Sequence, residues 1–234
     1  MSDVNGIPID SAAEKEAERL KAEADTKAKA ETVVDSKPPI TVIWSGGFDS
    51  TAVIIKYLEE GREVRVVSVS LSNNPNQARA EKDARRNITK LLSDEFPNKL
   101  IPSEDIVWPE VTCSIGGLSQ PPIWLYVAAM HASTTEVAFG WVKEADDIWH
   151  YRECIFRLPS AIDAFTGKTT TILIPFEWIT KKELIDYYVK RPHVFHQIST
   201  SELGMPWSLG NDEKCKEMQE LAELLKKRIE VKTP

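Results

Sequence analysis

The stretch "TVIWSGGFDSTAVIIKYL", residues 41–58, decides the fold. A run of apolar residues ends abruptly at the hexapeptide Ser45 to Ser50, and apolar side chains at helical spacing follow it. An apolar strand without polar alternation is typical of a parallel sheet that is covered on both faces. Gly46 and Gly47 allow positive φ and leave no side chain between the backbone and a neighbour. The junction therefore predicts a close approach to another group, either in a tight turn or at a phosphate.

The rest of the chain continues the alternation of strands and helices. We expect strands at 40–44, 64–71, 105–108, 136–139 and 170–174, and helices at 50–60, 76–96, 123–133, 180–190 and 212–229. Thr180 and Glu183 form a capping box at the start of one helix. The alternation predicts an α/β fold, a doubly wound and mostly parallel sheet with helices on both faces. Ligands bind such sheets at the carboxyl ends of the strands, here residues 45–51, 68–77, 109–120 and 140–153.

The composition narrows the classes of function. The chain has 36 acidic and 29 basic residues among 234, a net charge of −7, which makes a nucleic acid or an anionic membrane an unlikely partner. Neither a leader nor an apolar run of roughly 18 residues is present, so we expect a soluble, cytoplasmic protein. The three cysteines, Cys113, Cys154 and Cys215, form neither a disulfide framework nor a CxxC zinc signature.

Residues 1–38 differ from the rest because Ala, Glu and Lys dominate them. They lack an apolar face that a core would bury, so we expect a solvated tail, either disordered or a lone helix. An oligomerisation or docking arm is the alternative. The pair Pro38 and Pro39 marks a boundary, and residues 39–234 are the expected globular domain with a helical C-terminal part.

Three phosphate-binding loops compete for the hexapeptide. A dinucleotide fingerprint needs a third glycine that this segment lacks, and a Walker loop needs Lys where Asp49 stands. What remains is S-G-G-x-D-S between a strand and a helix. Successive backbone N–H groups and the helix N-terminus would converge on an anion there, with further donors from the hydroxyls of Ser45, Ser50 and Thr51. Asp49 would be repelled by bare phosphate, which suggests that it works through Mg²⁺. A plain glycine turn with an ordinary N-cap is the alternative.

The six residues closely resemble the loop motif of the PP-loop ATP pyrophosphatase superfamily, whose fold is the adenine-nucleotide alpha-hydrolase-like fold. The likeness is strongest to the 7-cyano-7-deazaguanine synthases of queuosine-precursor synthesis. Four blocks carry it in order: "WSGGFDSTAVIIKYLEEG", "SIGGLSQPPIWLYVAAMHA", "EVAFGWVKEADDIWHYRECIFRL" and "ILIPFEWITKKELIDYYVK". Leu118, Ser119 and Gln120 depart from the family, whose loop usually has an Arg and an Asn there.

The resemblance implies an ATP-dependent C–N ligase that adenylates 7-carboxy-7-deazaguanine and uses ammonia to form 7-cyano-7-deazaguanine (preQ0). The implied cofactors are ATP and Mg²⁺, the latter at Asp49. The implied nucleotide-binding residues are Ser45, Gly46, Gly47, Phe48, Asp49, Ser50, Thr51, Ser68, Val69, Ser70 and Gly140. The implied catalytic residues are Ser45, Asp49 and Lys181, and the implied substrate-binding residues are Trp141, Trp149, Tyr151 and Arg152. Ordinary packing is the alternative for the aromatic residues, and a solvated position in the first turn of a helix is the alternative for Lys181.

The family's four-cysteine zinc site is missing, because only Cys215 stands in the corresponding region. Ser201 and Met218 are poor zinc ligands, and we expect His193 and His196 to be ordinary surface or core residues. Two other functions stay open: another PP-loop enzyme such as a tRNA-modifying thiolase, and a degenerate nucleotide-binding module without turnover. The expected partners are a small deazaguanine substrate and ammonia, and a homodimer is left open.

Overall fold

The computed structural model describes residues 19, 21, 37–71, 75–102, 106–108, 120–143, 148–199 and 206–232. The chain divides into two compact units, Met1–Lys37 and Pro38–Pro234. The expected tail at residues 1–38 lies almost entirely outside the described residues. The sheet and the helices that cover it belong to the second unit.

A five-stranded sheet forms the centre of this unit, and all of its strand pairs are parallel. Its strand order is β4-β2-β1-β6-β7. The strands are β1 (Ile40–Ile43), β2 (Val64–Val67), β4 (Leu100–Ile101), β6 (Glu136–Ala138) and β7 (Thr171–Leu173). The middle strand β1 pairs with β2 on one side and with β6 on the other, so the winding direction reverses at β1. The predicted doubly wound parallel sheet is confirmed.

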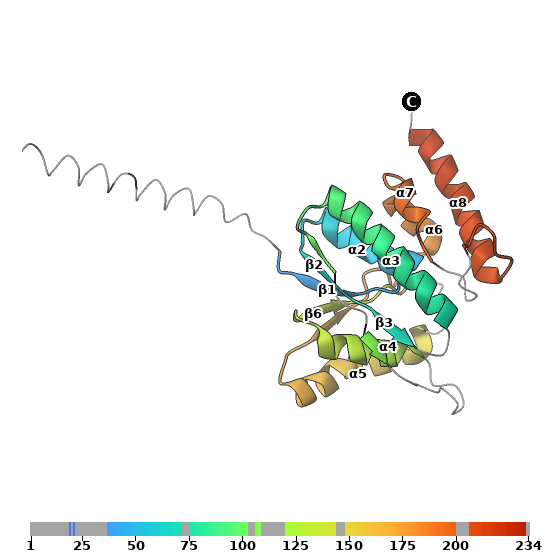
Figure 1. Ribbon diagram of the computed structural model, residues 1–234. Helices are drawn as coiled ribbons and strands as arrows, with labels where there is room; N and C mark the ends of the chain where they lie inside the picture. The colour runs from blue at the N-terminus through green and yellow to red at the C-terminus, as the bar shows by residue number, and fades with distance from the viewer. Residues whose placement is uncertain are drawn as a thin grey trace, which may run out of the picture. The chain divides into compact units, whose positions relative to one another are not determined.

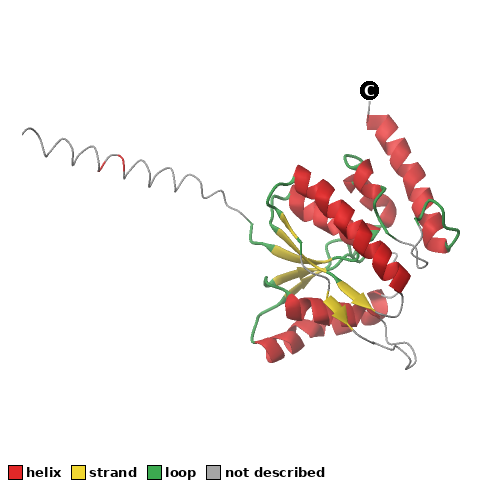
Figure 2. Cartoon of the chain, viewed as in Figure 1, coloured by secondary structure: helices red, strands yellow, loops and turns green. Residues whose placement is uncertain are grey.

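Helices cover both faces of the sheet (Figures 1 and 2). On one face lie α2 (Phe48–Glu59), α3 (Pro75–Glu95), α6 (Lys181–Leu184), the 3₁₀ helix η1 (Ile185–Tyr187), α7 (Pro192–Phe195) and α8 (Glu213–Lys232). On the other face lie α4 (Gln120–His131) and α5 (Ile148–Thr166). Among the described residues, no helix is long and apolar enough to span a membrane.

Side chains of β1 alternate between two cores. Ile40 and Val42 belong to the cluster under α2 and α3, whereas Ile43 belongs to the cluster under α4 and α5. This alternation follows from the pleat of a strand, in which successive side chains point to opposite faces. Because both faces are covered, all four residues of the strand are buried, and the hydroxyl of Thr41, its one polar member, pairs with that of Thr134 at 2.7 Å.

The single strand expected at 64–71 is wrong. The chain forms β2 and then β3 (Val69–Leu71), and β3 pairs with β5 (Ile106–Trp108) in a separate two-stranded parallel sheet. The break falls at Ser68, whose hydroxyl donates a hydrogen bond of 2.9 Å to the carbonyl oxygen of Trp44. That contact is made across the sheet, so the local pattern of apolar residues does not reveal it.

Four further elements differ from the expectation. The short β4, α5 and α7 were not predicted, and α5 has Pro159 in its interior, a residue that disfavours a helical interpretation. The helix expected at 180–190 forms only α6 and η1. Its predicted capping box is confirmed: the Thr180 side chain accepts from the Glu183 N–H, and the Glu183 carboxylate accepts from the Thr180 N–H.

Candidate functional site

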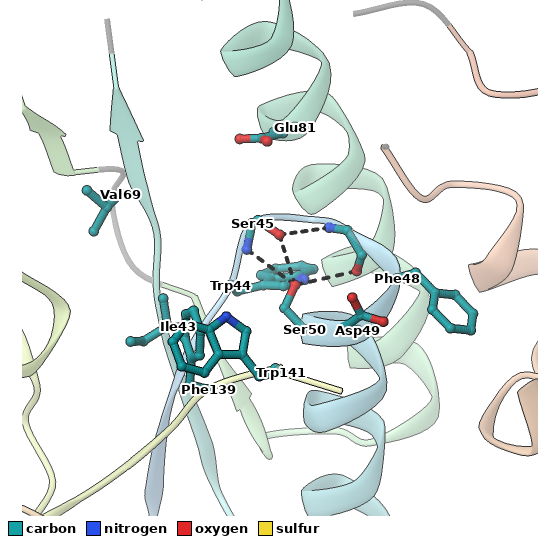
Figure 3. A pocket seen from close by; sticks show the side chains of 12 residues that line it. Ile43, Trp44, Ser45, Phe48, Asp49, Ser50, Val69, Glu81, Phe139 and Trp141 are labelled. Carbon is teal, nitrogen blue, oxygen red and sulfur yellow. Dashed lines mark hydrogen bonds between the residues drawn. The ribbon is translucent and has the colours of Figure 1, made fainter. Parts of the chain in front are cut away.

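The candidate site lies where the carboxyl ends of β1 and β6 diverge, at the reversal point of the sheet. Loops on opposite sides of such a point leave a crevice between them, which is where open α/β sheets bind ligands. A cavity of about 190 Å³ occupies this crevice (Figure 3). It is lined by Ile43, Trp44, Ser45, Gly47, Phe48, Asp49, Ser50, Val69, Glu81, Phe139, Gly140 and Trp141. The hexapeptide singled out from the sequence therefore forms one wall of the cavity.

The loop after β1 is held by contacts from two other parts of the chain. Gly46 has a φ of +88°, and an added Cβ there would lie 2.9 Å from the Glu81 carbonyl oxygen on α3. Arg85, also on α3, donates a 3.0 Å hydrogen bond from Nη1 to the Ser45 carbonyl oxygen. The Ser199 N–H donates to the Gly46 carbonyl oxygen at 3.1 Å. Both the φ value and the tight packing require glycine at position 46.

The N-terminus of α2 points into the same crevice. Gly47 is the N-cap residue, and its missing side chain leaves the cap without a side-chain hydrogen bond. Thr51 is the first residue whose N–H bonds within the helix, to the Gly47 carbonyl oxygen at 3.1 Å. Helical geometry thus leaves the N–H groups of residues 48–50 without acceptors inside the helix. The positive end of the helix dipole lies at the same place. Such an end suits an anion.

Two serine hydroxyls complete the polar wall. The Oγ atoms of Ser45 and Ser50 lie 3.0 Å apart, and the Gly47 N–H donates to the Ser45 Oγ at 3.1 Å (Figure 3). Both residues line the cavity. Because hydroxyls rotate and both donate and accept, this pair can reorient toward a bound anion.

The opposite wall is apolar. Phe139 and Trp141 follow β6 and meet edge to face, with ring centroids 4.6 Å apart, and Ile43 and Val69 extend the same wall. Between them Gly140 packs on α2: an added Cβ would lie 2.6 Å from the Ser50 Cα and 2.7 Å from the Ser50 N. A polar wall facing an apolar one suits a ligand with an anionic part and a planar part.

Two residues that line the cavity carry carboxylates, Asp49 in the first turn of α2 and Glu81 on α3. The Glu81 Oε1 accepts from Gln77 at 3.0 Å, and its Oε2 lies 3.9 Å from the Arg85 Nη1. An anionic ligand beside the Asp49 carboxylate would need a cation between the charges, and hard oxygen ligands of this kind suit Mg²⁺. Within the described ranges, no group of three His, Cys, Asp or Glu side chains lies close enough to hold a metal alone. A cation here would therefore share its ligands with the anion.

Two of the predicted nucleotide-binding residues use their hydroxyls within the protein. Thr51 is completely buried and accepts a 3.0 Å hydrogen bond from the Trp44 indole N–H. Ser68 is also buried, and its hydroxyl donates to the Trp44 carbonyl oxygen. The two bonds connect Trp44, at the end of β1, to α2 and to the residue that follows β2. Their contact with a nucleotide stays a prediction, as does that of Val69, which lines the cavity.

Lys181 and Arg152 have protein partners away from the cavity lining. The Lys181 Nζ pairs with the Glu217 Oε2 at 2.6 Å, which ties α6 to α8. The Arg152 Nε donates to the Glu177 Oε1 at 2.7 Å, and its guanidinium lies over the rings of Phe156 and Trp178. Their proposed roles stay predictions. The side chains of Ser70, Cys113, Leu118, Ser119, Gln120, Trp149, Tyr151 and Cys154 lie outside the described residues.

The sequence did not single out Glu81, Arg85 or Ser199. One feature of the sequence could have identified Arg85: it stands on the buried face of α3 together with Ala84 and Ile88. A charged side chain on a buried face needs a partner, and here that partner is the loop. Glu81 and Ser199 left no local signal, since their contacts join segments far apart in the sequence.

Comparison with protein-family models gave no match, and neither did comparison with curated proteins. Among solved structures, the chain is similar to a protein from Methanocaldococcus jannaschii described as a predicted subunit of tRNA methyltransferase. The two share 12% sequence identity, and the match covers 63% of this chain and 72% of the other, with a TM-score of 0.40.

Proposed function

We propose that this chain is an ATP-dependent enzyme of the PP-loop type, which splits ATP between the α and β phosphates. One observation supports this most directly. The glycine loop and the N-terminus of α2 line a cavity at the reversal point of a parallel sheet, opposite an apolar aromatic wall. A Walker loop would place an ammonium at the phosphates, but Asp49 occupies that position.

Each wall has a role in this proposal. The N–H groups of residues 48–50 and the hydroxyls of Ser45 and Ser50 bind the β and γ phosphates, which leave together as pyrophosphate. Trp141 in the aromatic wall stacks on the planar ring of the acceptor, and Ser68 and Val69 at the exit of β2 lie beside adenine. Asp49 helps to hold Mg²⁺, which neutralises charge on the departing phosphates.

The proposed acceptor is the carboxylate of 7-carboxy-7-deazaguanine. Its oxygen attacks the α phosphorus, pyrophosphate leaves, and ammonia then displaces AMP to give the amide. The amide oxygen then attacks the α phosphorus of a second ATP and pyrophosphate leaves; loss of AMP and of both amide N–H protons yields the nitrile. The support for this acceptor is the resemblance of the four sequence blocks to 7-cyano-7-deazaguanine synthases.

The test is to incubate the purified full chain with ATP, Mg²⁺, ammonium and 7-carboxy-7-deazaguanine. We expect AMP, pyrophosphate and a new nitrile by mass spectrometry. AMP and pyrophosphate that form only with a different carboxylate would keep the PP-loop activity but reject this acceptor. Tight ATP binding without turnover on any carboxylate would favour a binding module instead.

The Asp49→Asn variant provides the first residue-level prediction. Loss of the carboxylate should lower the rate of AMP release by about 100-fold, because the charge that helps to hold the metal is gone. Asp94→Asn is the matched control, since Asp94 is exposed on α3. Equal rates for the two variants would reject the role of Asp49.

A further inference from the structure

A cluster of aromatic residues from the C-terminal part of the chain packs behind the first turn of α2. The ring of Phe48 points to the side opposite Trp141 (Figure 3). It stacks on Tyr188, with centroids 4.9 Å apart and an interplanar angle of 21°. Phe195 meets both rings edge to face, at 6.0 Å and 5.6 Å. Tyr188 has no exposed surface, so it belongs to the core and does not touch a ligand.

The Tyr188 hydroxyl makes a specific contact with this turn. It donates a 2.6 Å hydrogen bond to the carbonyl oxygen of Phe48, the first residue of α2. Burial, with a contribution from the charge of Asp49, raises the pKa of Tyr188 well above its ordinary value. The hydroxyl therefore keeps its proton and remains a donor.

A second contact from the same part of the chain holds the loop on the other side of Gly47. The Ser199 N–H bonds to the Gly46 carbonyl oxygen, while Tyr188 bonds to the carbonyl oxygen of Phe48. The N-cap is thus fixed from both sides. Each contact restrains a peptide unit next to the N–H groups that face the cavity.

We propose that Tyr188 is a positioning residue for the anion-binding turn: its hydroxyl sets the orientation of the N–H groups of residues 48–50. A phenylalanine would fill the same space, so the hydroxyl is not needed for packing. Burying it is favourable only because it is hydrogen-bonded to the turn. This inference rests on the proposed role of the loop in binding the phosphates of ATP.

Tyr188→Phe removes the hydroxyl and keeps the stacked ring. Tyr187→Phe is the matched control, because Tyr187 is the neighbouring residue and packs on Phe176, with centroids 5.3 Å apart. Affinities for pyrophosphate, ATP and adenosine are measured by calorimetry in the presence of Mg²⁺, at a temperature where circular dichroism shows both variants folded. We expect Tyr188→Phe to bind pyrophosphate and ATP about 3- to 10-fold more weakly, with adenosine affinity unchanged. Tyr187→Phe should match the wild type for all three.

Unchanged pyrophosphate affinity in Tyr188→Phe, or an equal loss for adenosine, would overturn the positioning role. A wild-type chain that binds none of the three ligands would reject the proposed function instead. In that case amide hydrogen exchange decides the inference. Faster exchange at residues 48–50 in Tyr188→Phe than in Tyr187→Phe, with β1 unchanged, supports it, and identical exchange rejects it.

Discussion

At the residue scale, glycine is required at two positions of the site for different reasons. Gly46 has a left-handed φ of +88° that few other residues adopt, and its neighbours on α3 leave no space for a Cβ. Gly140 is required by contact alone, because the backbone of Ser50 lies where a Cβ would stand. The first requirement follows from a motif visible in the sequence. The second depends on how closely the exit of β6 approaches α2.

Gly140→Ala should therefore damage both the fold and the site. The added methyl group meets backbone atoms of Ser50, which must shift, so we expect a loss of about 1–3 kcal/mol in the free energy of unfolding. Pyrophosphate affinity should fall as well, because the shifted residue is in the anion-binding turn. Urea denaturation and calorimetry measure the two effects.

Gly167→Ala is the control for this variant. Gly167 has a φ of +66° but nothing within 4 Å of an added Cβ, so alanine there should cost about 1–2 kcal/mol through backbone strain alone. Pyrophosphate affinity should stay at the wild-type value. If Gly140→Ala also kept that affinity, the packing of β6 on α2 would not matter for the site.

At the element scale, the capping box at the beginning of α6 is a local pattern that is present in the folded structure. Hydrogen bonds from the backbone and then from the side chain of Thr180 lower the pKa of the exposed Glu183 carboxyl group. A carboxyl group whose pKa is lower in the folded state stabilises the fold above its ordinary pKa. That contribution is lost as the pH falls through the lowered value. The cap therefore stabilises α6 at neutral pH and weakens in acid.

Glu183→Gln should have a lower melting temperature than the wild type at pH 7. The gap should shrink as the pH falls below about 4, where the wild-type carboxylate also becomes protonated. Thermal unfolding from pH 7 to pH 3 measures it. A gap of constant size would show that the charge of Glu183 does not contribute. Thr180→Ala should lower the free energy of unfolding by about 1 kcal/mol at neutral pH.

Pro159 explains why α5 is not evident in the sequence. A proline in a helix interior removes one backbone hydrogen bond and crowds the preceding turn. Pro159→Ala should therefore raise the free energy of unfolding by about 1 kcal/mol or more, as measured by urea denaturation. A decrease would mean that the proline ring makes packing contacts worth more than the missing bond.

At the scale of the whole molecule, Arg191 joins three segments that are far apart in the sequence. Its side chain is 4% exposed, donates from Nε and Nη2 to both carboxylate oxygens of Glu95, and donates from Nη1 to the Glu59 Oε1 at 2.8 Å. Its guanidinium also lies over the ring of Phe96, 5.1 Å from the centroid. The ends of α2 and α3 are thereby connected to the residue that precedes α7.

Arg191→Met should lower the free energy of unfolding by about 3 kcal/mol, because two carboxylates lose their shared partner. Arg191→Lys should recover only part of the loss, since an ammonium cannot reproduce the planar two-bond contact with Glu95. Urea denaturation compares the three proteins. Equal stability of the lysine variant and the wild type would show that charge alone matters.

How much was predictable depends on the range of the interactions. The strand expected at 40–44, the helix expected at 50–60 and the capping box at Thr180 are local patterns, and the structure has all three, with the helix beginning two residues earlier, at Phe48. The break at Ser68 and the hydrogen bond from the Ser199 N–H to the Gly46 carbonyl oxygen depend on partners at distant positions in the chain. Local patterns do not contain such partners.

The sequence by itself determined the class of fold and the position of the glycine loop. The period of apolar residues selects strand or helix, and S-G-G-x-D-S marks the exit of β1. Only the tertiary structure decided what surrounds the loop. Gly140 packs against α2, Arg85 and Glu81 reach the loop from α3, and Tyr188 lies behind the first turn of α2. The physical reason is that a cavity is made where strand exits and helices from distant parts of the chain meet, and packing alone brings them together.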